Sequence, residues 1–383
     1  MLAQCLAGEP PEVLPRTLLE EPCGQALFGT WVEGLADRFD EALCQSYAGL
    51  FAQALVHAGE PTSAKVLVDR YQRVRRPRKV SGDPRRVFVL SRVTLGADVA
   101  VTSVLLAAAR QRFPSAELVF AGPRKNYELF AADPDIHHVP VEYPRGGLRE
   151  RVASGAELRS VLNVPDSLVI DPDSRLTQLG LLPVCDEERY YLFESRAYGG
   201  ASECSLPDLA AAWAEETLGV KGAKRFVALP PADRQEPGIT VSFGVGENPA
   251  KRIADPFEEE LLALLAKTGA CLTIDTGAGG WEAERVRSAV ARSGVQARFW
   301  EGSFAGFAAR IAGSRLYVGY DSAGGHVAAA CGVPLISVFA GFPSPRMFAR
   351  WRPAGARTAV IRVDRPDPAE TLQRVKEALA AHG

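Results

Sequence analysis

The segment YVGYDSAGGHVAAACGVPLISVFAG, residues 317–341, decides the fold class. It has the pattern of a buried strand, a polar turn, a short helix of small residues and a second buried strand. A strand, a helix and a strand in this order form the repeating unit of a parallel α/β sheet. The turn places Asp321, Ser322 and His326 within an otherwise apolar run, at the carboxyl end of a strand, where such sheets bind ligands.

The composition is that of a folded globular protein. The chain has 383 residues, of which 47% are hydrophobic and 23% charged, and its net charge is -2. A single hydrophobic core stops growing at roughly 250–300 residues, so we expect two domains and an appendage. Nothing in the charge balance suggests a nucleic-acid partner. The seven cysteines have no metal-binding spacing and the N-terminus lacks a signal-peptide pattern, so we expect a cytoplasmic protein.

Short β-rich runs alternate with helical segments from residue 87 onward, in two series. The first series has predicted strands at 87–91, 117–122, 137–142 and 167–171, and the second at 239–244, 271–275, 297–301, 315–321, 334–339 and 359–363. Predicted helices lie at 99–113, 206–219, 256–268, 281–293 and after Asp367. This pattern predicts two Rossmann-like parallel-sheet domains, 81–235 and 236–383, with a Pro-rich linker at 229–238 and ligands in a cleft between them.

Residues 1–80 have a different pattern from the rest of the chain. Leu35, Phe39, Leu43 and Tyr47 recur at helical spacing, which predicts a helical extension. The extension ends in a basic stretch, 71–86, in which Asp83 is the one acid against seven cations: Arg73, Arg75, Arg76, Arg78, Lys79, Arg85 and Arg86. We interpret this stretch as a solvated linker, or alternatively as a patch for an anionic acceptor or an anionic membrane surface.

The first polar turn of interest follows the strand at 87–91, in SRVTLGADVAVTS, residues 91–103. Asp98 stands near the start of the predicted helix. An aspartate there is either an N-cap that accepts backbone N–H bonds or a general base that takes a proton from an acceptor hydroxyl. The sequence leaves both roles open.

Two further turns belong to the second series of strands. The turn GVGENPAKR, residues 244–252, combines the flexible Gly244 and Gly246 with the cations Lys251 and Arg252. Such a turn suits a phosphate or diphosphate, although a solvated loop would have the same composition. The turn DTGAGG, residues 275–280, carries Asp275 and Thr276, which can face a nucleotide base or ribose; it does not contain the GxGxxG dinucleotide fingerprint.

The turn DSAGGH, residues 321–326, is the most informative of the polar turns. At a helix start, unpaired N–H groups and the helix dipole favour an anion, and the small residues Ala323, Gly324 and Gly325 allow a phosphate to approach closely. The Ser322 hydroxyl can donate as well. Asp321 would repel a phosphate and is better suited to accept from sugar hydroxyls. His326 is either a core histidine or a diphosphate contact.

Two DPD triplets, 133–135 and 171–173, have the form of carboxylate pairs that hold divalent metals. Proline between two aspartates is also ordinary turn chemistry. We therefore expect no metal and no cofactor.

Together these motifs resemble the heptosyltransferase-type glycosyltransferases of family 9, which have the two-lobed GT-B fold. DSAGGHVAAACGVPLISVF matches the family's Asp-Thr/Ser-Gly/Ala-x-x-His turn, small-residue helix and GVP before a strand. SRVTLGADVAVTSVLLAAARQRFPSAEL matches its Arg-x-Ser-x-x-Gly-Asp turn, with Asp98 at the acidic position, and NPAKR matches the glycine turn that leads to AKR. The matches span about residues 87–383. Two departures stand out: Ala97 separates Gly96 from Asp98, and GFPSPRMFARW, 341–351, replaces the usual GPT/SDP loop.

The resemblance implies inverting transfer of a heptose-like sugar from a nucleotide diphosphate donor, with ADP as the expected nucleotide, to a hydroxyl of a glycan or glycolipid such as a lipopolysaccharide core. Asp98 would be the base, and Lys251, Arg252, Ser322 and the helix start would hold the leaving diphosphate without a metal. This function would place the protein in the cytoplasm, at the inner face of the membrane if the basic stretch binds there. The alternatives are a catalytically inactive GT-B binding or scaffold protein and a nucleotide-sugar epimerase on the same fold.

Overall fold

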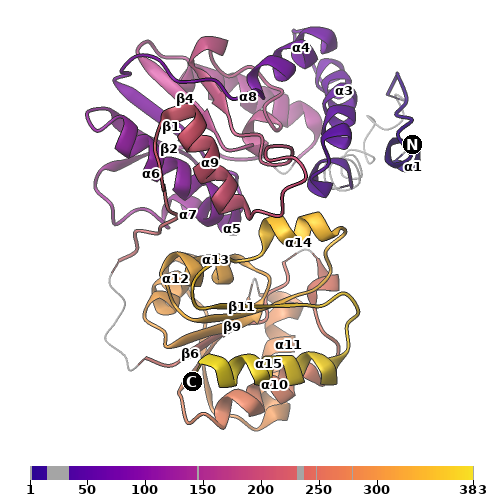
Figure 1. Cartoon of the computed structure of the whole chain (residues 1–383), viewed down its shortest axis with the longest axis vertical. Helices are drawn as coiled ribbons and strands as arrows, with labels where there is room; N and C mark the ends of the chain where they lie inside the picture. The colour runs from indigo at the N-terminus through magenta and orange to yellow at the C-terminus, as the bar shows by residue number, and fades with distance from the viewer. Residues whose placement is uncertain are drawn as a thin grey trace. The chain divides into compact units, whose positions relative to one another are not determined.

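The computed structural model describes residues 2–14, 34–144, 146–230, 237–246, 248–277 and 279–382. The chain forms two compact units, Met1–Tyr127 with Pro134–Arg225, and Glu128–Asp133 with Phe226–Gly383 (Figure 1). Most of the predicted linker at 229–238 lies outside the described residues. Among the helices of the described residues, none is long and apolar enough to span a membrane.

The first unit contains a five-stranded parallel sheet in the order β3-β2-β1-β4-β5. Its strands are β1 (Arg86–Leu90), β2 (Glu117–Gly122), β3 (Ile136–Pro140), β4 (Ser167–Asp171) and β5 (Tyr190–Leu192). Its helices after β1 are α5 (Leu95–Ala97), α6 (Ser103–Arg112), α7 (Arg124–Tyr127), α8 (Leu148–Leu162) and α9 (Leu206–Leu218). Between α5 and α6 the chain forms the π-helical turn η4 (Asp98–Thr102), and short 3₁₀ turns are η5 (Arg175–Thr177) and η6 (Glu187–Arg189).

The second unit contains a six-stranded parallel sheet in the order β11-β10-β9-β6-β7-β8. Its strands are β6 (Ile239–Ser242), β7 (Leu272–Asp275), β8 (Ala297–Trp300), β9 (Leu316–Tyr320), β10 (Leu335–Phe339) and β11 (Thr358–Arg362). Its helices are α10 (Phe257–Ala266), α11 (Gly280–Ser293), α12 (Phe304–Ala312), α13 (Ala323–Ala330), α14 (Pro345–Trp351) and α15 (Pro368–His382), with the 3₁₀ turn η7 (Pro249–Lys251).

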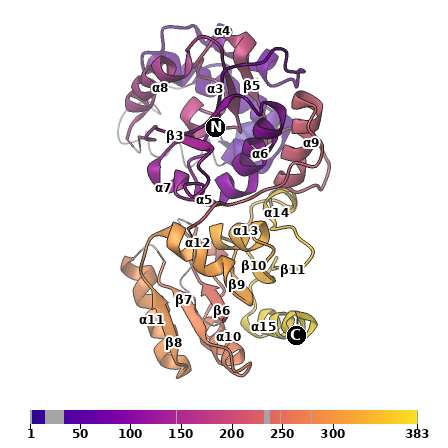
Figure 2. The same ribbon diagram turned by 90° about the vertical axis from the view of Figure 1, so that its left-hand side faces the viewer.

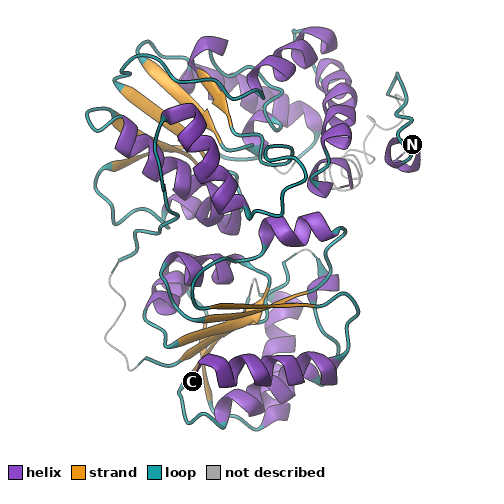
Figure 3. Ribbon diagram, viewed as in Figure 1, coloured by secondary structure: helices purple, strands orange, loops and turns teal. Residues whose placement is uncertain are grey.

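Both sheets have the strand order of a Rossmann-type, doubly wound fold. The first strand of each unit, β1 or β6, lies between the second and the fourth, because the chain first adds strands on one side and then returns to the other. Helices cover both faces of each sheet (Figure 3). The strands are buried apolar runs, as expected for a sheet covered on both faces. The prediction of two parallel α/β domains is therefore confirmed, and the point where strand order reverses lies between β1 and β4 in one unit and between β6 and β9 in the other.

The helical extension contains α1 (Leu2–Leu6), the 3₁₀ turn η3 (Ala36–Arg38), α3 (Glu41–His57) and α4 (Ala64–Val74). Side-chain caps define where two of these helices begin, since Asp40 accepts from two backbone N–H groups of α3 and Ser63 accepts from Val66 N of α4. α3 packs against α8, and α4 packs against β5. The extension is thus built into the first unit (Figure 2).

Three arginines of the basic stretch contact the first unit beside α4. Arg75, whose side chain is 9% exposed, binds Glu194 at 2.7 Å, and Arg73 binds Glu187 at 2.8 Å. Arg78 donates to the carbonyl oxygen of Glu187 at 2.6 Å. The interpretation as a solvated linker is wrong for Arg75, which is buried in its ion pair with Glu194, whereas Arg73 and Arg78 stay exposed while they bind the first unit.

Candidate functional site

In the second unit, the turns after β6 and β9 meet at the carboxyl edge of the sheet, at the point where strand order reverses. Lys251, from the turn after β6, donates through Nζ to the Asp321 carboxylate at 2.7 Å and to the Asp321 carbonyl oxygen at 3.2 Å. The Lys251 side chain is 20% exposed, while that of Asp321 is 7% exposed. The structure therefore brings together two predicted site residues that are 70 positions apart, with the cation still reachable from solvent.

The first turn of α13 lies directly beside this pair. Ser322 is its N-cap residue, with extended backbone angles, and its side chain makes no capping hydrogen bond. The hydroxyl instead lies 3.2 Å from the hydroxyl of Tyr317. The backbone N–H groups that begin α13 are therefore not capped by Ser322, which is the arrangement that suits an anionic ligand.

Close packing explains the glycines of this turn. A Cβ atom on Gly324 would lie 2.3 Å from the Tyr317 hydroxyl oxygen, so a larger residue does not fit there. A Cβ on Gly325 would lie 3.3 Å from Pro353. His326 is 5% exposed, and its ring lies edge-on to Trp351, with 6.0 Å between centroids. These contacts bring the end of α14 and the residues just after it against the first turn of α13.

The loop after β10 contacts the turn after β6. Asn248 donates to the carbonyl oxygen of Gly341 at 3.1 Å. Gly341 has a φ of +69°, and a Cβ on it would lie 2.5 Å from the backbone of Ala250. Gly341, the first residue of the segment that departs from the family motif, thus lies against the turn that carries Lys251, and the rest of that segment includes helix α14.

Two other predicted site residues of the second unit, Arg252 and Thr276, bind partners other than Lys251 and Asp321. Arg252 turns toward α10, where it pairs with Glu258 at 3.3 Å and with Asp255, so it does not join Lys251 at Asp321. Thr276 donates through its hydroxyl to the carbonyl oxygen of Trp300 at 3.0 Å, which ties the end of β7 to the end of β8. This hydrogen bond gives Thr276 a structural role.

Asp275 and the glycines after β6 lie at the same edge. Asp275 accepts from Gly277 N at 3.1 Å and from the Ser242 hydroxyl at 3.2 Å, and burial raises the pKa of its carboxyl. Gly244 faces that same serine hydroxyl. Gly246, at a φ of +58°, has open space where a side chain would stand.

Glu282 is a polar residue of this edge that the sequence prediction missed. It lies in the first turn of α11, is 5% exposed, and accepts from Val245 N at 2.9 Å. A Cβ on Gly277 would lie 2.2 Å from its carboxylate. The sequence does show an acidic residue in the first turn of the helix that follows DTGAGG. Acidic residues are common in the first turn of any helix, so this position did not mark Glu282 as a site residue.

In the first unit, Asp98 is completely buried and fully hydrogen bonded. Its Oδ1 accepts from Arg92 N at 2.7 Å and from the Thr102 hydroxyl at 2.6 Å, and its Oδ2 accepts from the Ser91 hydroxyl and Asn126 Nδ2, both at 2.6 Å. Burial raises the pKa of Asp98, against the lowering effect of these donors. The helix begins at Leu95 rather than near Val99, so Asp98 lies inside it and the N-cap interpretation is wrong.

The π-helical turn at Asp98–Thr102 explains how the helix accommodates the additional residue Ala97. Such a turn inserts one residue into an α-helix and occurs often at functional sites. The preceding loop is strained as well, because the β-branched Val93 has a φ of 74°. The turn that resembles the family motif is therefore held in an uncommon conformation.

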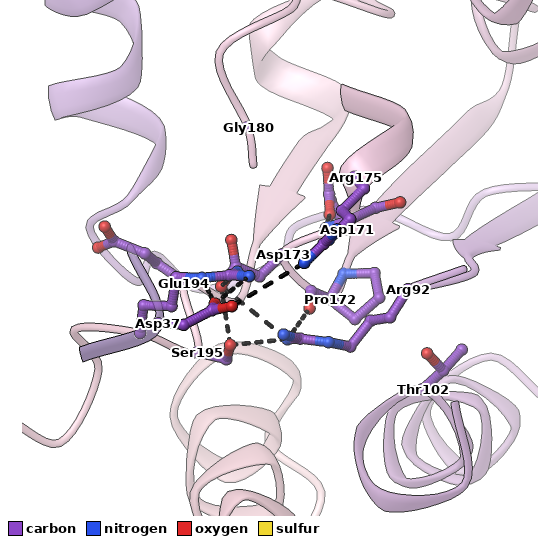
Figure 4. A network of polar contacts seen from close by, with 12 residues as sticks. Asp37, Arg92, Thr102, Asp171, Pro172, Asp173, Arg175, Gly180, Glu194 and Ser195 are labelled. Atoms are coloured by element: carbon purple, nitrogen blue, oxygen red, sulfur yellow. Dashed lines mark hydrogen bonds and ion pairs between the residues drawn. The ribbon is translucent and has the colours of Figure 1, made fainter. Parts of the chain in front are cut away.

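A buried ionic network follows at the ends of β4 and β5 (Figure 4). Asp173, 1% exposed, binds Arg196 at 2.5 Å and the Ser195 hydroxyl at 2.7 Å. Arg92 Nη1 donates to that hydroxyl and to the carbonyl oxygen of Pro172, both at 2.6 Å, and burial lowers the pKa of Arg92 to about 10.

Asp171 does not share these partners. It accepts from Ser174 N at 2.6 Å and from the Thr177 hydroxyl at 2.6 Å, and burial raises its pKa to about 6. Within the described ranges, no group of three or more His, Cys, Asp or Glu side chains is placed to hold a metal ion.

Comparison with known proteins gives one family and a set of structures. Residues 300–380 match the model of glycosyltransferase family 9 (heptosyltransferase). No curated protein matches the chain in sequence.

Three solved structures share the fold over most of the chain. A family 9 glycosyl transferase from Veillonella parvula superposes with a TM-score of 0.60 and 14% identity, over 78% of this chain and 98% of that one. Heptosyltransferase WaaC of E. coli, solved with ADP, gives 0.58 and 17%, over 78% and 100%. ADP-heptose lps heptosyltransferase II of E. coli gives 0.54 and 20%, over 78% and 98%. The resemblance to glycosyltransferase family 9 is thus confirmed, by the family model over the C-terminal part and by the GT-B-type fold of two parallel-sheet α/β domains.

Proposed function

We propose that the chain is an inverting glycosyltransferase whose second unit binds a nucleotide diphosphate sugar. The observation that carries the proposal is the cradle formed by Lys251, Asp321 and the start of α13 at the point where strand order reverses. The solved WaaC structure contains ADP, so an ADP-linked, heptose-like sugar is the first donor to test. The acceptor is a hydroxyl of a glycan or glycolipid.

In this proposal the cradle stabilises the leaving diphosphate. Negative charge accumulates on the diphosphate as the bond to the sugar breaks, and donors already in place lower the energy of that state. Lys251, the Ser322 hydroxyl and the N–H groups of α13 supply the donors, so we propose that transfer needs no metal. Asp321 balances the charge of Lys251 in the free protein and accepts from sugar hydroxyls in the complex.

Asp98 is the proposed base. Its raised pKa favours proton uptake compared with an exposed aspartate. Because four donors occupy its two oxygens, an acceptor hydroxyl has to replace one of them before it can give up its proton. The side-chain donors that compete for this place are the Ser91 hydroxyl, the Thr102 hydroxyl and the Asn126 amide.

The same geometry favours a second candidate function, a protein that binds a nucleotide sugar without transferring it. Asp98 is 0% exposed, and the hydrogen bonds that saturate it also order the turn at Ser91 and Arg92. In this alternative Asp98 has a purely structural role. The cradle of the second unit keeps its ligand in both cases.

Nucleotide binding tests the cradle. We expect one of ADP, UDP, GDP and TDP to bind by isothermal titration calorimetry, with the same affinity in magnesium and in EDTA. Lys251→Ala should weaken it by about ten- to a hundredfold, since a hydrogen bond to a charged group contributes about 1.5–3 kcal/mol. Lys267→Ala is the matched control, because Lys267 is exposed and follows α10, before β7 begins at the opposite edge. Failure of all four nucleotides to bind would refute the proposed site.

Sugar transfer separates the two candidate functions. Release of the nucleotide from ADP-heptose in the presence of a heptose-deficient lipopolysaccharide core would support the transferase. If Asp98 is the base, Asp98→Asn should keep nucleotide affinity and lose transfer by about 10²–10⁴-fold. Nucleotide binding without release, for any hydroxyl acceptor offered, would favour the binding protein.

A further inference from the structure

We propose that Arg196 and Arg175 form an anion-binding site at the carboxyl edge of the first sheet, and that Asp37 of the helical extension occupies it in the free protein. The ligand is a carboxylate or phosphate group with a hydroxyl beside it. This site is separate from the nucleotide cradle, and its occupancy does not depend on the donor proposal.

The geometry is that of a carboxylate held between two guanidinium groups (Figure 4). Asp37 Oδ1 accepts from Arg196 at 3.1 Å through Nε and at 3.0 Å through Nη2. Asp37 Oδ2 lies 3.9 Å from Arg175 Nη2. Two donors of Arg196 therefore meet one oxygen, while Arg175 faces the other, an arrangement that carboxylates and phosphates both fit.

The place of this pair is one where α/β sheets bind ligands. Arg175 follows β4 and Arg196 follows β5, so both lie beyond the carboxyl ends of adjacent strands. Asp37 reaches them from the helical extension, which precedes β1 in the chain. The extension thus adds a carboxylate to an edge where parallel α/β sheets bind ligands.

Exposure indicates that Asp37 is the exchangeable partner of Arg196. The second carboxylate on that arginine, Asp173, is 1% exposed, whereas the side chain of Asp37 is 23% exposed. Arg175 is 31% exposed, so an anion from solvent can approach it. Replacing Asp37 by a ligand anion keeps the charge of Arg196 balanced and avoids leaving a buried cation unpaired.

Asp173 also indicates what the ligand carries beside its anionic group. Its Oδ2 accepts from Arg196 and Ser195, but its buried Oδ1 has no hydrogen-bond partner among the described residues. A buried acceptor without a hydrogen bond destabilises the folded protein. A ligand that donates a hydrogen bond to this oxygen would remove that cost and bind more tightly. A hydroxyl next to the anionic group would supply that donor.

Binding at this site should displace the segment around Asp37. Leu35 and Ala36 are 0% exposed and Phe39 is 2% exposed, so buried apolar side chains anchor the segment on both sides of Asp37. A ligand anion that binds Arg196 and Arg175 breaks the contacts that Asp37 makes with these two side chains. Anion binding and opening of residues 34–40 are therefore coupled.

The test uses the full chain with three probes, inorganic phosphate, glycolate and acetate, at constant ionic strength adjusted with chloride because salt screens charges. We expect phosphate or glycolate to increase hydrogen exchange at residues 34–40 several-fold. Asp37→Ala should bind the same anion about tenfold more tightly than wild type, and Arg175→Ala should lose the effect. Glycolate binding more tightly than acetate supports the hydroxyl contact at Asp173, and phosphate binding most tightly assigns the site to a phosphate ester.

Asp186→Ala is the matched control, since Asp186 forms a surface ion pair with Arg189 in the same unit at 2.7 Å. The proposal is wrong if Asp37→Ala gains no affinity, if Asp186→Ala gains as much, or if saturating anion leaves exchange at 34–40 unchanged in wild type. Asp37→Asn, which keeps the shape and removes the charge, replaces Asp37→Ala in the same comparison if the alanine variant does not fold.

Discussion

The carboxyl edges of the two sheets share one strand order but differ in how their polar groups are paired. In the first unit, Asp98 accepts four hydrogen bonds, and Asp173, Arg92 and Arg196 are buried in a network that includes Asp37. In the second unit, Lys251 is partly exposed and α13 begins without a side-chain cap. At the first edge the charged groups are buried and paired with one another, while at the second edge the ion pair of Lys251 and Asp321 is partly exposed beside a helix start without a side-chain cap.

This difference shows that position at a strand end does not by itself make a residue available to a ligand. Buried charges in the first unit need partners from the chain because solvent does not reach them. The second unit has short, glycine-rich turns that leave room beside its cation. The predictions below test whether the first edge depends on internal pairing and whether the second edge binds an anion.

The largest expected effect comes from breaking the network of the first unit. Asp173→Ala leaves Arg196 with Asp37 alone and removes the carboxylate beside Arg92, so we expect a loss of about 3–5 kcal/mol in the free energy of unfolding. Urea denaturation followed by circular dichroism measures it. The exposed pair of Asp186 and Arg189 gives the control, as Asp186→Ala should cost at most about 1 kcal/mol. Equal costs for the two variants would contradict the comparison.

Stability should fall as pH rises through the range in which the buried carboxyls of the first unit ionise. Burial raises the pKa of Glu194 to about 7 and that of Asp171 to about 6, so the folded chain holds protons that the unfolded chain releases near pH 4. Their contribution is complete below about pH 4 and is lost as pH rises through about 6 for Asp171 and about 7 for Glu194, a change of roughly 3 kcal/mol for each group.

Urea midpoints measured between about pH 4.5 and 7.5 test this expectation. Glu194→Gln should flatten the curve, because glutamine keeps the shape of the side chain that meets Tyr71 and Arg75 and does not titrate. A midpoint that rises with pH in wild type, with the same slope in the variant, would show that other groups govern the response.

A smaller effect is expected at Gly324, where the second edge is packed. Gly324→Ala places a methyl group 2.3 Å from the Tyr317 hydroxyl oxygen and should cost about 1–3 kcal/mol. Gly49→Ala is the control, since Gly49 lies in α3 with open space around it and should gain about 0.5–1 kcal/mol. Thermal unfolding of both variants decides whether close packing, rather than helix propensity, requires Gly324.

The smallest effect separates ligand binding from capping. Ser322→Ala removes a donor to the proposed diphosphate and should lower nucleotide affinity by about 1 kcal/mol, with a similarly small change in stability. Ser303 caps α12 by accepting from Gly306 N, so Ser303→Ala should cost about 1 kcal/mol of stability and leave nucleotide affinity unchanged. Calorimetry and thermal unfolding of the two variants measure both quantities. An unchanged affinity in Ser322→Ala would remove this hydroxyl from the site.

Most of the strands could be predicted because a buried parallel strand is a short continuous apolar run. All ten predicted strands are present. β5 was missed because Tyr190–Leu192 is a three-residue edge strand within an irregular region. The contacts of Lys251 and the saturation of Asp98 depend on side-chain direction, which strand and turn patterns do not contain.

Ion pairs between distant segments were beyond prediction for a different reason. Arg75 and Glu194, and Asp37 and Arg196, are separated by more than a hundred residues, and many charged residues are equally plausible partners in sequence. Arg75 meets Glu194 only because α4 packs beside β5, and this packing is a tertiary contact that local sequence patterns do not contain. A charge count around Asp83 therefore did not reveal that Arg73, Arg75 and Arg78 contact residues 187–194.

The π-helical turn at Asp98–Thr102 also bears on how this chain can change by mutation. Each residue of an α-helix advances by about 100° around its axis, so deleting Ala97 would rotate every later side chain relative to Leu95 unless the π-helical turn closed at the same time. If it closed, α6 would keep its face toward the sheet and the deletion would be absorbed locally. The turn is therefore a point where the chain can gain or lose one residue while the core keeps its register.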